Sequence, residues 1–207
     1  MESAIFGLIG VVVGALLATA KDWWFEYRRR RKNLEYLSIL VVSIFDHFVA
    51  GCIEVCRDDG LAHGSRDEHG CKAPQVDTPK LELLAIDVDW KSLPSSLMYE
   101  ILNFPTLVDN ANSYIYSIVE FVAGPPDYEE FFEDRAEQYS ELGLRAMEIS
   151  TKLRKLCKLP DPVENEEGWS RKKWLKKYKS EAIESIERRK RSNLEVLIDL
   201  ESNKNNT

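Results

Sequence analysis

Four sulfur and imidazole side chains are the best candidates for chemistry in this sequence. Cys52 and Cys56 are four residues apart and therefore share one face of a helix, while His69 and Cys71 follow in a stretch rich in glycine and aspartate. Thiolate and imidazole are preferred zinc ligands, so the four could form a metal site that holds this stretch against the helix. Their spacing matches no compact zinc module, and the alternative is a buried cysteine pair beside a polar loop.

Other catalytic signals are sparse. His47 follows Asp46, and a carboxylate could orient the imidazole as a base, although a lone helical histidine is more often exposed or satisfied locally. The sequence contains no Gly-rich phosphate loop, no Gly-x-Ser-x-Gly elbow and no His-Glu-x-x-His motif. No cofactor is therefore expected, with zinc as the one candidate. The sequence favours a protein that is not an enzyme, and an enzymatic role would depend on the Cys/His cluster.

The strongest structural signal is an uncharged stretch from Ala4 to Ala20. It is at the lower length limit for crossing a hydrocarbon core of about 30 Å. Aromatic rings and then an unbroken run of cations follow it, which is typical of the point where a transmembrane helix leaves the bilayer. This flank comprises Trp23, Trp24, Tyr27, Arg28, Arg29, Arg30, Arg31 and Lys32. The sequence therefore predicts a single-pass membrane anchor over residues 1–32, called the anchor segment below.

The cationic run also predicts an orientation. By the positive-inside rule it stays in the cytoplasm, which puts the N-terminus outside and the following domain on the cytoplasmic side of the plasma (inner) membrane. A cleaved signal peptide is one alternative, but it would carry its positive charge before the apolar stretch. A buried core helix is the other, but such a helix would seldom be uncharged all round.

Small residues recur at every fourth position of the anchor segment. They are Gly10, Gly14 and Ala18. Such a face lets a second helix approach closely, so it is compatible with a homo-dimer through the anchor. The alternative is that these residues have no special role, since glycine and alanine are common in transmembrane helices.

The remaining chain, residues 33–200, is predicted to form a helical domain, with a disordered tail over 201–207. Apolar residues recur at three- and four-residue steps from Leu34 to Val55, so the anchor helix should continue to about residue 58. Residues 60–79 are rich in Gly, Asp, His and Pro and predict a long loop. The following stretch, 80–90, alternates weakly but has no partner strand, so we expect an ordered strap across helices.

The sequence of the second half of the domain predicts further helices. Pro105 is expected to interrupt the helical stretch that begins near Ser92, leaving a short helix before it and a second one up to Val122. Two more helices are expected over 127–158 and 169–200. The predicted fold class is all-α: an N-terminal transmembrane helix that continues into a cytoplasmic antiparallel bundle of about four principal helices.

Charge is distributed unevenly along the chain. The formal net charge of −7 argues against general nucleic-acid binding. Residues 127–148 carry eight acidic and two basic side chains, whereas residues 169–191 carry ten basic and three acidic ones. The candidate basic surface consists of five cations and one aromatic residue: Arg171, Lys172, Lys173, Trp174, Lys176 and Lys177. They could dock on the acidic helix of the same domain, or face anionic lipid or a partner.

Three function hypotheses follow. The preferred one is a membrane-anchored interaction or adaptor module, with the lipid bilayer and an unidentified protein as partners. The second is a membrane-acting effector, as in a defence or toxin system, that oligomerises through its anchor. The third is a metal-dependent enzyme that uses the Cys/His cluster.

Overall fold

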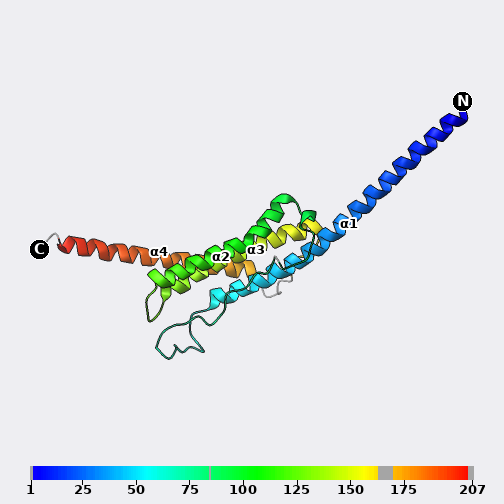
Figure 1. Cartoon of the computed structure of the whole chain (residues 1–207). Helices are drawn as coiled ribbons and strands as arrows, with labels where there is room; N and C mark the ends of the chain where they lie inside the picture. Colours follow the sequence, from blue (N-terminus) through cyan, green and yellow to red (C-terminus); the bar gives the residue numbers. More distant parts are fainter. Residues whose placement is uncertain (1, 84, 163–169, 205–207) are drawn as a thin grey trace.

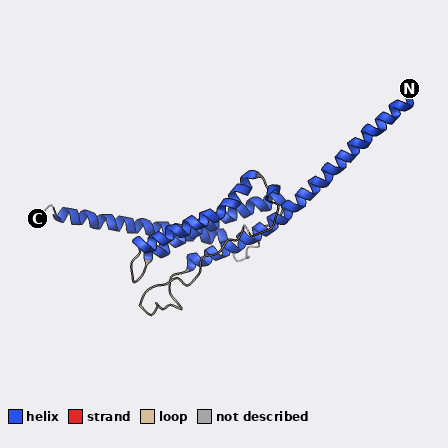
Figure 2. Cartoon of the chain, viewed as in Figure 1, coloured by secondary structure: helices blue, strands red, loops and turns tan. Residues whose placement is uncertain are grey.

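The chain is all-helical throughout the part that the structure describes. The computed structural model describes residues 2–83, 85–162 and 170–204, and these contain four α-helices and no named strand (Figure 2). The helices are α1 (Glu2–Arg57), α2 (Ser95–Phe121), α3 (Glu129–Cys157) and α4 (Arg171–Lys204), with a 3₁₀ turn at Trp90–Ser92. The helical-bundle prediction is therefore confirmed.

The first helix, α1, is a rod with two different halves. Its N-terminal half extends away from the other helices, and its C-terminal half packs among them (Figure 1). Burial begins where the apolar repeat begins: Leu37, Val41 and Phe45 have no exposed surface. The prediction that one helix continues from the anchor segment into the core is confirmed, and α1 ends at Arg57.

The third helix, α3, is the centre of the bundle and contacts all three others. Pairs of contacting side chains show that it runs antiparallel to each of them, so α1, α2 and α4 share one direction. The pairs that set this register are Ser38–Cys157 and Asp58–Arg135 for α1, Glu100–Lys152 and Tyr114–Asp134 for α2, and Glu141–Lys179 and Glu130–Arg189 for α4.

Two parallel neighbours such as α1 and α2 need a crossing connection, and the segment between them provides it. It leaves the end of α1 as the predicted loop and returns along the bundle as an extended strap (Figure 1). Leu83 is fully buried in the core, whereas Asp87 is exposed. The predicted strap is confirmed, and the buried side chain of Leu83 fixes the strap to the helices.

Leu83→Ala should therefore destabilise the fold. Truncating a fully buried leucine costs about 2–5 kcal/mol, because the cavity adds to the lost transfer free energy. Denaturant unfolding of the full chain in mild detergent, followed by circular dichroism, would measure the change. Asp87→Ala is the matched control and should change the free energy of unfolding by less than about 0.5 kcal/mol.

The prediction of a break at Pro105 is wrong, because α2 is one continuous helix with Pro105 inside it. A proline costs an internal helix one backbone hydrogen bond. Here the residues on both sides of it, Ile101, Phe104 and Val108, are all buried against the bundle. Packing on both sides therefore outweighs the local preference. The ring of Phe104 lies edge-on to Phe45 at 5.0 Å between centroids.

The ends of α2 and α3 agree with the sequence patterns, whereas the end of α4 does not. Gly124, Pro125 and Pro126 follow α2, as predicted. Helix α4 includes residues 201–204, which were expected to fray, whereas Trp169 and residues 205–207 lie outside the described residues.

Candidate functional site

The structure does not bring the four predicted metal ligands together. Cys52 is fully buried between helices, and the Cys56 thiol donates to the backbone carbonyl of Ala136 on α3 at 3.5 Å. His69 and Cys71 lie in the loop, where the Cys71 thiol donates to the His69 carbonyl at 3.9 Å. Among the described residues, no group of three or more His, Cys, Asp or Glu side chains is close enough to hold a metal ion.

Burial also keeps the helical thiols protonated. It raises the pKa of Cys56 to about 12 and raises the pKa of Cys52 well above its ordinary value. Because a metal binds the thiolate, both shifts oppose metal binding.

We therefore expect chelation to leave stability unchanged. Purified full-length protein treated with a strong chelator should unfold at the same temperature as untreated protein, since a structural zinc ion would contribute folding free energy. Melting curves with and without chelator measure this. A clear drop in melting temperature, reversed by added zinc, would instead support the Cys52, Cys56, His69 and Cys71 site.

A buried ion pair holds the loop to the bundle. Asp58 follows the last residue of α1, and its carboxylate accepts hydrogen bonds from the backbone amides of Gly60, Gln75 and Val76. The same carboxylate accepts from the guanidinium of Arg135 on α3 at 2.8 Å, and that guanidinium also donates to the Val76 carbonyl. Both charged side chains are at most 3% exposed. We call this cluster the Asp58–Arg135 pin.

The hydrogen bonds of the pin hold its carboxylate in the charged form. Burial by itself would raise the pKa of Asp58. The bonds from Arg135 and from the three backbone amides outweigh that effect, so the pKa lies below its ordinary value of 3.8. This pair was not predicted from the sequence.

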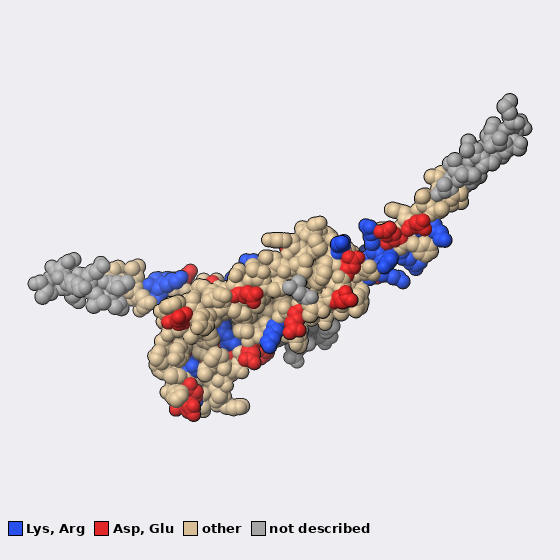
Figure 3. Space-filling model, viewed as in Figure 1, with Lys and Arg blue, Asp and Glu red and all other residues tan. Residues whose placement is uncertain are grey.

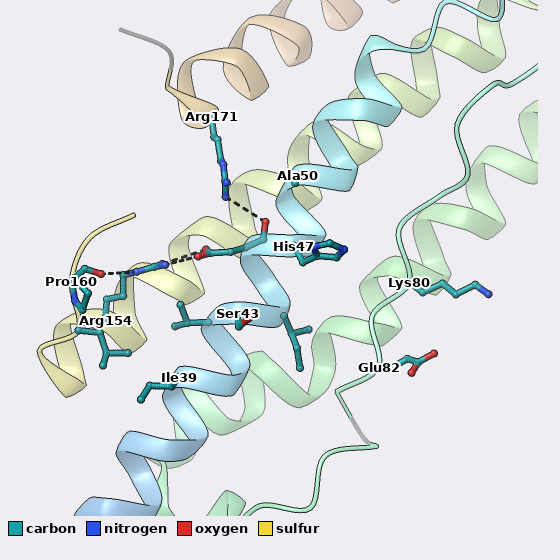
Figure 4. Close-up of a pocket in the computed structure, with 13 residues that line it drawn as sticks. Ile39, Ser43, His47, Ala50, Lys80, Glu82, Arg154, Pro160 and Arg171 are labelled. Atoms are coloured by element: carbon teal, nitrogen blue, oxygen red, sulfur yellow. Dashed lines mark hydrogen bonds and ion pairs between the residues drawn. The ribbon is translucent and has the colours of Figure 1, made fainter. Parts of the chain in front are cut away.

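A groove of about 910 Å³ lies along the outward face of α1 (Figure 4). Arg154 on α3 lies on one side, bonded to Asp46 at 2.5 Å, and Arg171 donates to the Asp46 carbonyl from the same side. Lys80 and Glu82 of the strap lie on the other side (Figure 4). Because Asp46 pairs with Arg154, it is not the partner that would orient the His47 imidazole as a base.

The anchor segment lies outside the bundle. Leu16 and Leu17 are more than 60% exposed, and a Cβ built on Gly14 would meet no neighbouring atom within 4 Å. In the part of the chain that the structure describes, α1 is the one helix long and apolar enough to cross a membrane, and its qualifying stretch lies between Leu16 and Arg57 with half of the apolar window buried in the bundle. The small-residue face at Gly10, Gly14 and Ala18 lies on this free half of the helix.

The flank of the anchor segment is also exposed. Trp23, Trp24 and Tyr27 each keep more than half of their surface accessible, and Trp23 stacks on Tyr27 with 6.0 Å between ring centroids. Lysine and arginine side chains gather where the free half of α1 meets the bundle (Figure 3). The aromatic rings and then the cations therefore follow one another along a half of α1 that the bundle does not cover.

Comparison with protein-family models, with curated proteins and with solved structures found no match.

The basic helix α4 docks partly on the acidic helix α3, as one of the charge hypotheses predicted. Arg189 lies 3.1 Å from the Glu133 carboxylate and 3.6 Å from those of Glu130 and Asp134, and Lys179 bonds Glu141 at 2.6 Å. These pairs use the later cations of α4.

The earlier cations of α4 remain largely available. Lys177 pairs with Glu181 and lies over the Trp174 ring. Lys172, Lys173 and Lys176 are exposed and have no ion pair with any described residue. These three lysines are called the free basic surface below.

Proposed function

We propose that the chain is a single-pass membrane-anchored interaction module whose bundle lies on the cytoplasmic side of the plasma (inner) membrane. The observation that carries this proposal is the free N-terminal half of α1, where large apolar side chains project from a helix that the bundle does not cover. Exposed apolar surface of this extent is unfavourable in water and favourable in a bilayer. A core helix would instead be covered by its own domain.

The helix that leaves the bilayer also supports the proposed geometry. Since α1 continues without a break from the anchor segment to Arg57, the bundle is connected to the membrane by a rigid rod. The rings of Trp23 and Tyr27 would lie at the headgroups, and the cations from Arg28 to Lys32 on the cytoplasmic side. The anchor thus fixes where the bundle presents its surfaces.

The free basic surface supports an acidic protein as the partner. Lys172 and Lys176 are four residues apart on one exposed face of α4, so both can meet carboxylates of the same partner. Neither lysine forms an ion pair with a described residue. Charged rims of this kind mainly raise the association rate, and salt screens them.

Affinity purification of the full chain in mild detergent tests this proposal. We expect a reproducible acidic partner that is also recovered with a shortened chain starting at Asn33. Lys172→Glu with Lys176→Glu should lower recovery at least about tenfold, because like charges repel across the interface. The matched control, Lys155→Glu with Lys158→Glu, changes two exposed lysines elsewhere and should leave recovery unchanged.

Two outcomes would contradict the interaction module. One is a partner whose recovery is the same for both pairs of substitutions. The other is no partner at all, with the full chain running as a homo-oligomer and the shortened chain as a monomer. The second outcome would favour the effector that oligomerises through its anchor.

A further inference from the structure

The bundle leaves one stripe of α1 uncovered. Tyr36, Ile39, Ser43 and His47 are exposed, and they recur at three- and four-residue steps along the half of α1 that otherwise packs in the core. The groove of about 910 Å³ includes the last three of them and Ala50. An exposed stripe inside a core helix needs an explanation.

The stripe lies on the same side of α1 as the small residues of the anchor segment. A helix has 3.6 residues per turn, so residues separated by a whole number of turns share a face. Ile39, Ser43 and Ala50 follow Gly14 by 25, 29 and 36 residues, which are about seven, eight and ten turns. Because α1 is one uninterrupted helix, the small-residue face of the anchor segment continues into the groove.

We propose that a second copy of this chain covers this face, with the two α1 helices side by side and parallel from the anchor segment to the groove. This dimer rests on the proposed function, because two anchors in one membrane hold the copies parallel. Sharing a bilayer also raises the effective concentration of each groove for the other. The predicted anchor contact is then the first part of a longer seam.

The charges beside the groove fit a two-fold axis parallel to α1. Such an axis places one side of the groove of each copy against the opposite side of its partner's groove. One side carries Arg171, and the other carries Lys80 and Glu82 (Figure 4). None of these three forms an ion pair with a described residue, and all three line the groove. In the dimer, Glu82 of each copy therefore meets Arg171 of the other.

Three cations on the same face could oppose the seam. Lys21, Arg28 and Lys32 follow Gly14 by 7, 14 and 18 residues, about two, four and five turns. All three lie in or next to the flank of the anchor segment, where long side chains can turn away toward headgroups. The ammonium of Lys21 lies over the Phe25 ring. We therefore expect these three side chains to turn away from the seam.

Cysteine cross-linking in lipid vesicles tests the seam. Ser43→Cys in the full chain, with Cys71→Ser as background, should form a disulfide-linked dimer on mild oxidation, because residue 43 lies near the two-fold axis. Ser180→Cys in the same background is the control, as Ser180 is exposed on α4. We expect at least about a tenfold higher dimer yield for Ser43→Cys, since proximity sets the yield.

A charge swap adds the specificity test. Glu82→Arg alone and Arg171→Glu alone should each lower the Ser43→Cys dimer yield several-fold, and the two together should restore it. Equal yields for Ser43→Cys and Ser180→Cys would overturn the seam, and so would a double variant that dimerises less than either single one.

The same vesicles separate this proposal from the proposed function. Protein that floats with the vesicles but does not cross-link overturns the seam alone. Protein that does not float overturns both.

Discussion

Asp58→Ala is expected to lower the free energy of unfolding by about 3–5 kcal/mol. The reason is that the substitution leaves the Arg135 guanidinium buried with no opposite charge, and removes the acceptor for three backbone amides. Denaturant unfolding of the full chain in mild detergent, followed by circular dichroism, measures the change. The loop after α1 should also become more sensitive to protease.

Two comparisons make this prediction specific. Arg57→Ala removes the neighbouring exposed pair with Glu54 and should cost less than about 0.5 kcal/mol. Asp58→Ala with Arg135→Met should be less destabilising than the sum of the two single changes, because no unpaired charge remains buried. Strict additivity would show that the two charges do not depend on each other.

The same pin predicts a pH dependence. The folded pKa of Asp58 lies below its ordinary value of 3.8, so the folded state binds the proton less readily than the unfolded chain does. The stabilisation is therefore complete above about pH 4 and is lost as the pH falls through the lower folded value. Wild-type protein and the Asp58→Ala variant should approach each other in stability in that acidic range. A stability difference that stays constant down to pH 2 would contradict this assignment.

Val12→Asp is expected to abolish stable membrane insertion. A carboxylate near the centre of a transmembrane helix costs about 2.5–3.5 kcal/mol, which corresponds to roughly a hundredfold change in partition. Flotation with lipid vesicles after alkaline extraction measures the inserted fraction. The control is Tyr99→Asp, because Tyr99 is 69% exposed on the bundle and should not affect insertion. Equal flotation of the two variants would contradict the anchor.

Much of the fold could be predicted from local patterns. The three- and four-residue recurrence of apolar side chains predicted that α1 continues into the core, and Gly124 to Pro126 predicted the end of α2. The predicted break at Pro105 was wrong because a proline affects only the local helix, by removing one backbone hydrogen bond. Ile101 and Phe104 are buried against helices that are distant in the sequence, and this burial stabilises α2. The register of α3 against its neighbours also depends on contacts between distant residues, so periodicity does not reveal it.

The candidate site was harder to predict, because it too depends on contacts between residues that are distant in the sequence. Cys52 and Cys56 share a face, as expected, but spacing cannot show that the loop carrying Cys71 would be held elsewhere. Asp58 and Arg135 are 77 residues apart in the sequence. One signal was present: Arg135 is one of two cations in the acidic stretch 127–148, and it lies four residues before buried Tyr139 on the inner side of the helix. A cation there requires a buried partner.

The most direct test of the membrane-anchored module is the location of its bundle. The full chain would be produced in a bacterium, and intact spheroplasts would be treated with an external protease before and after lysis. The bundle should be recovered with the membrane fraction, remain protected in intact spheroplasts, and become digested once they are lysed. A bundle that is soluble after lysis without detergent, or that is digested in intact spheroplasts, would contradict the account.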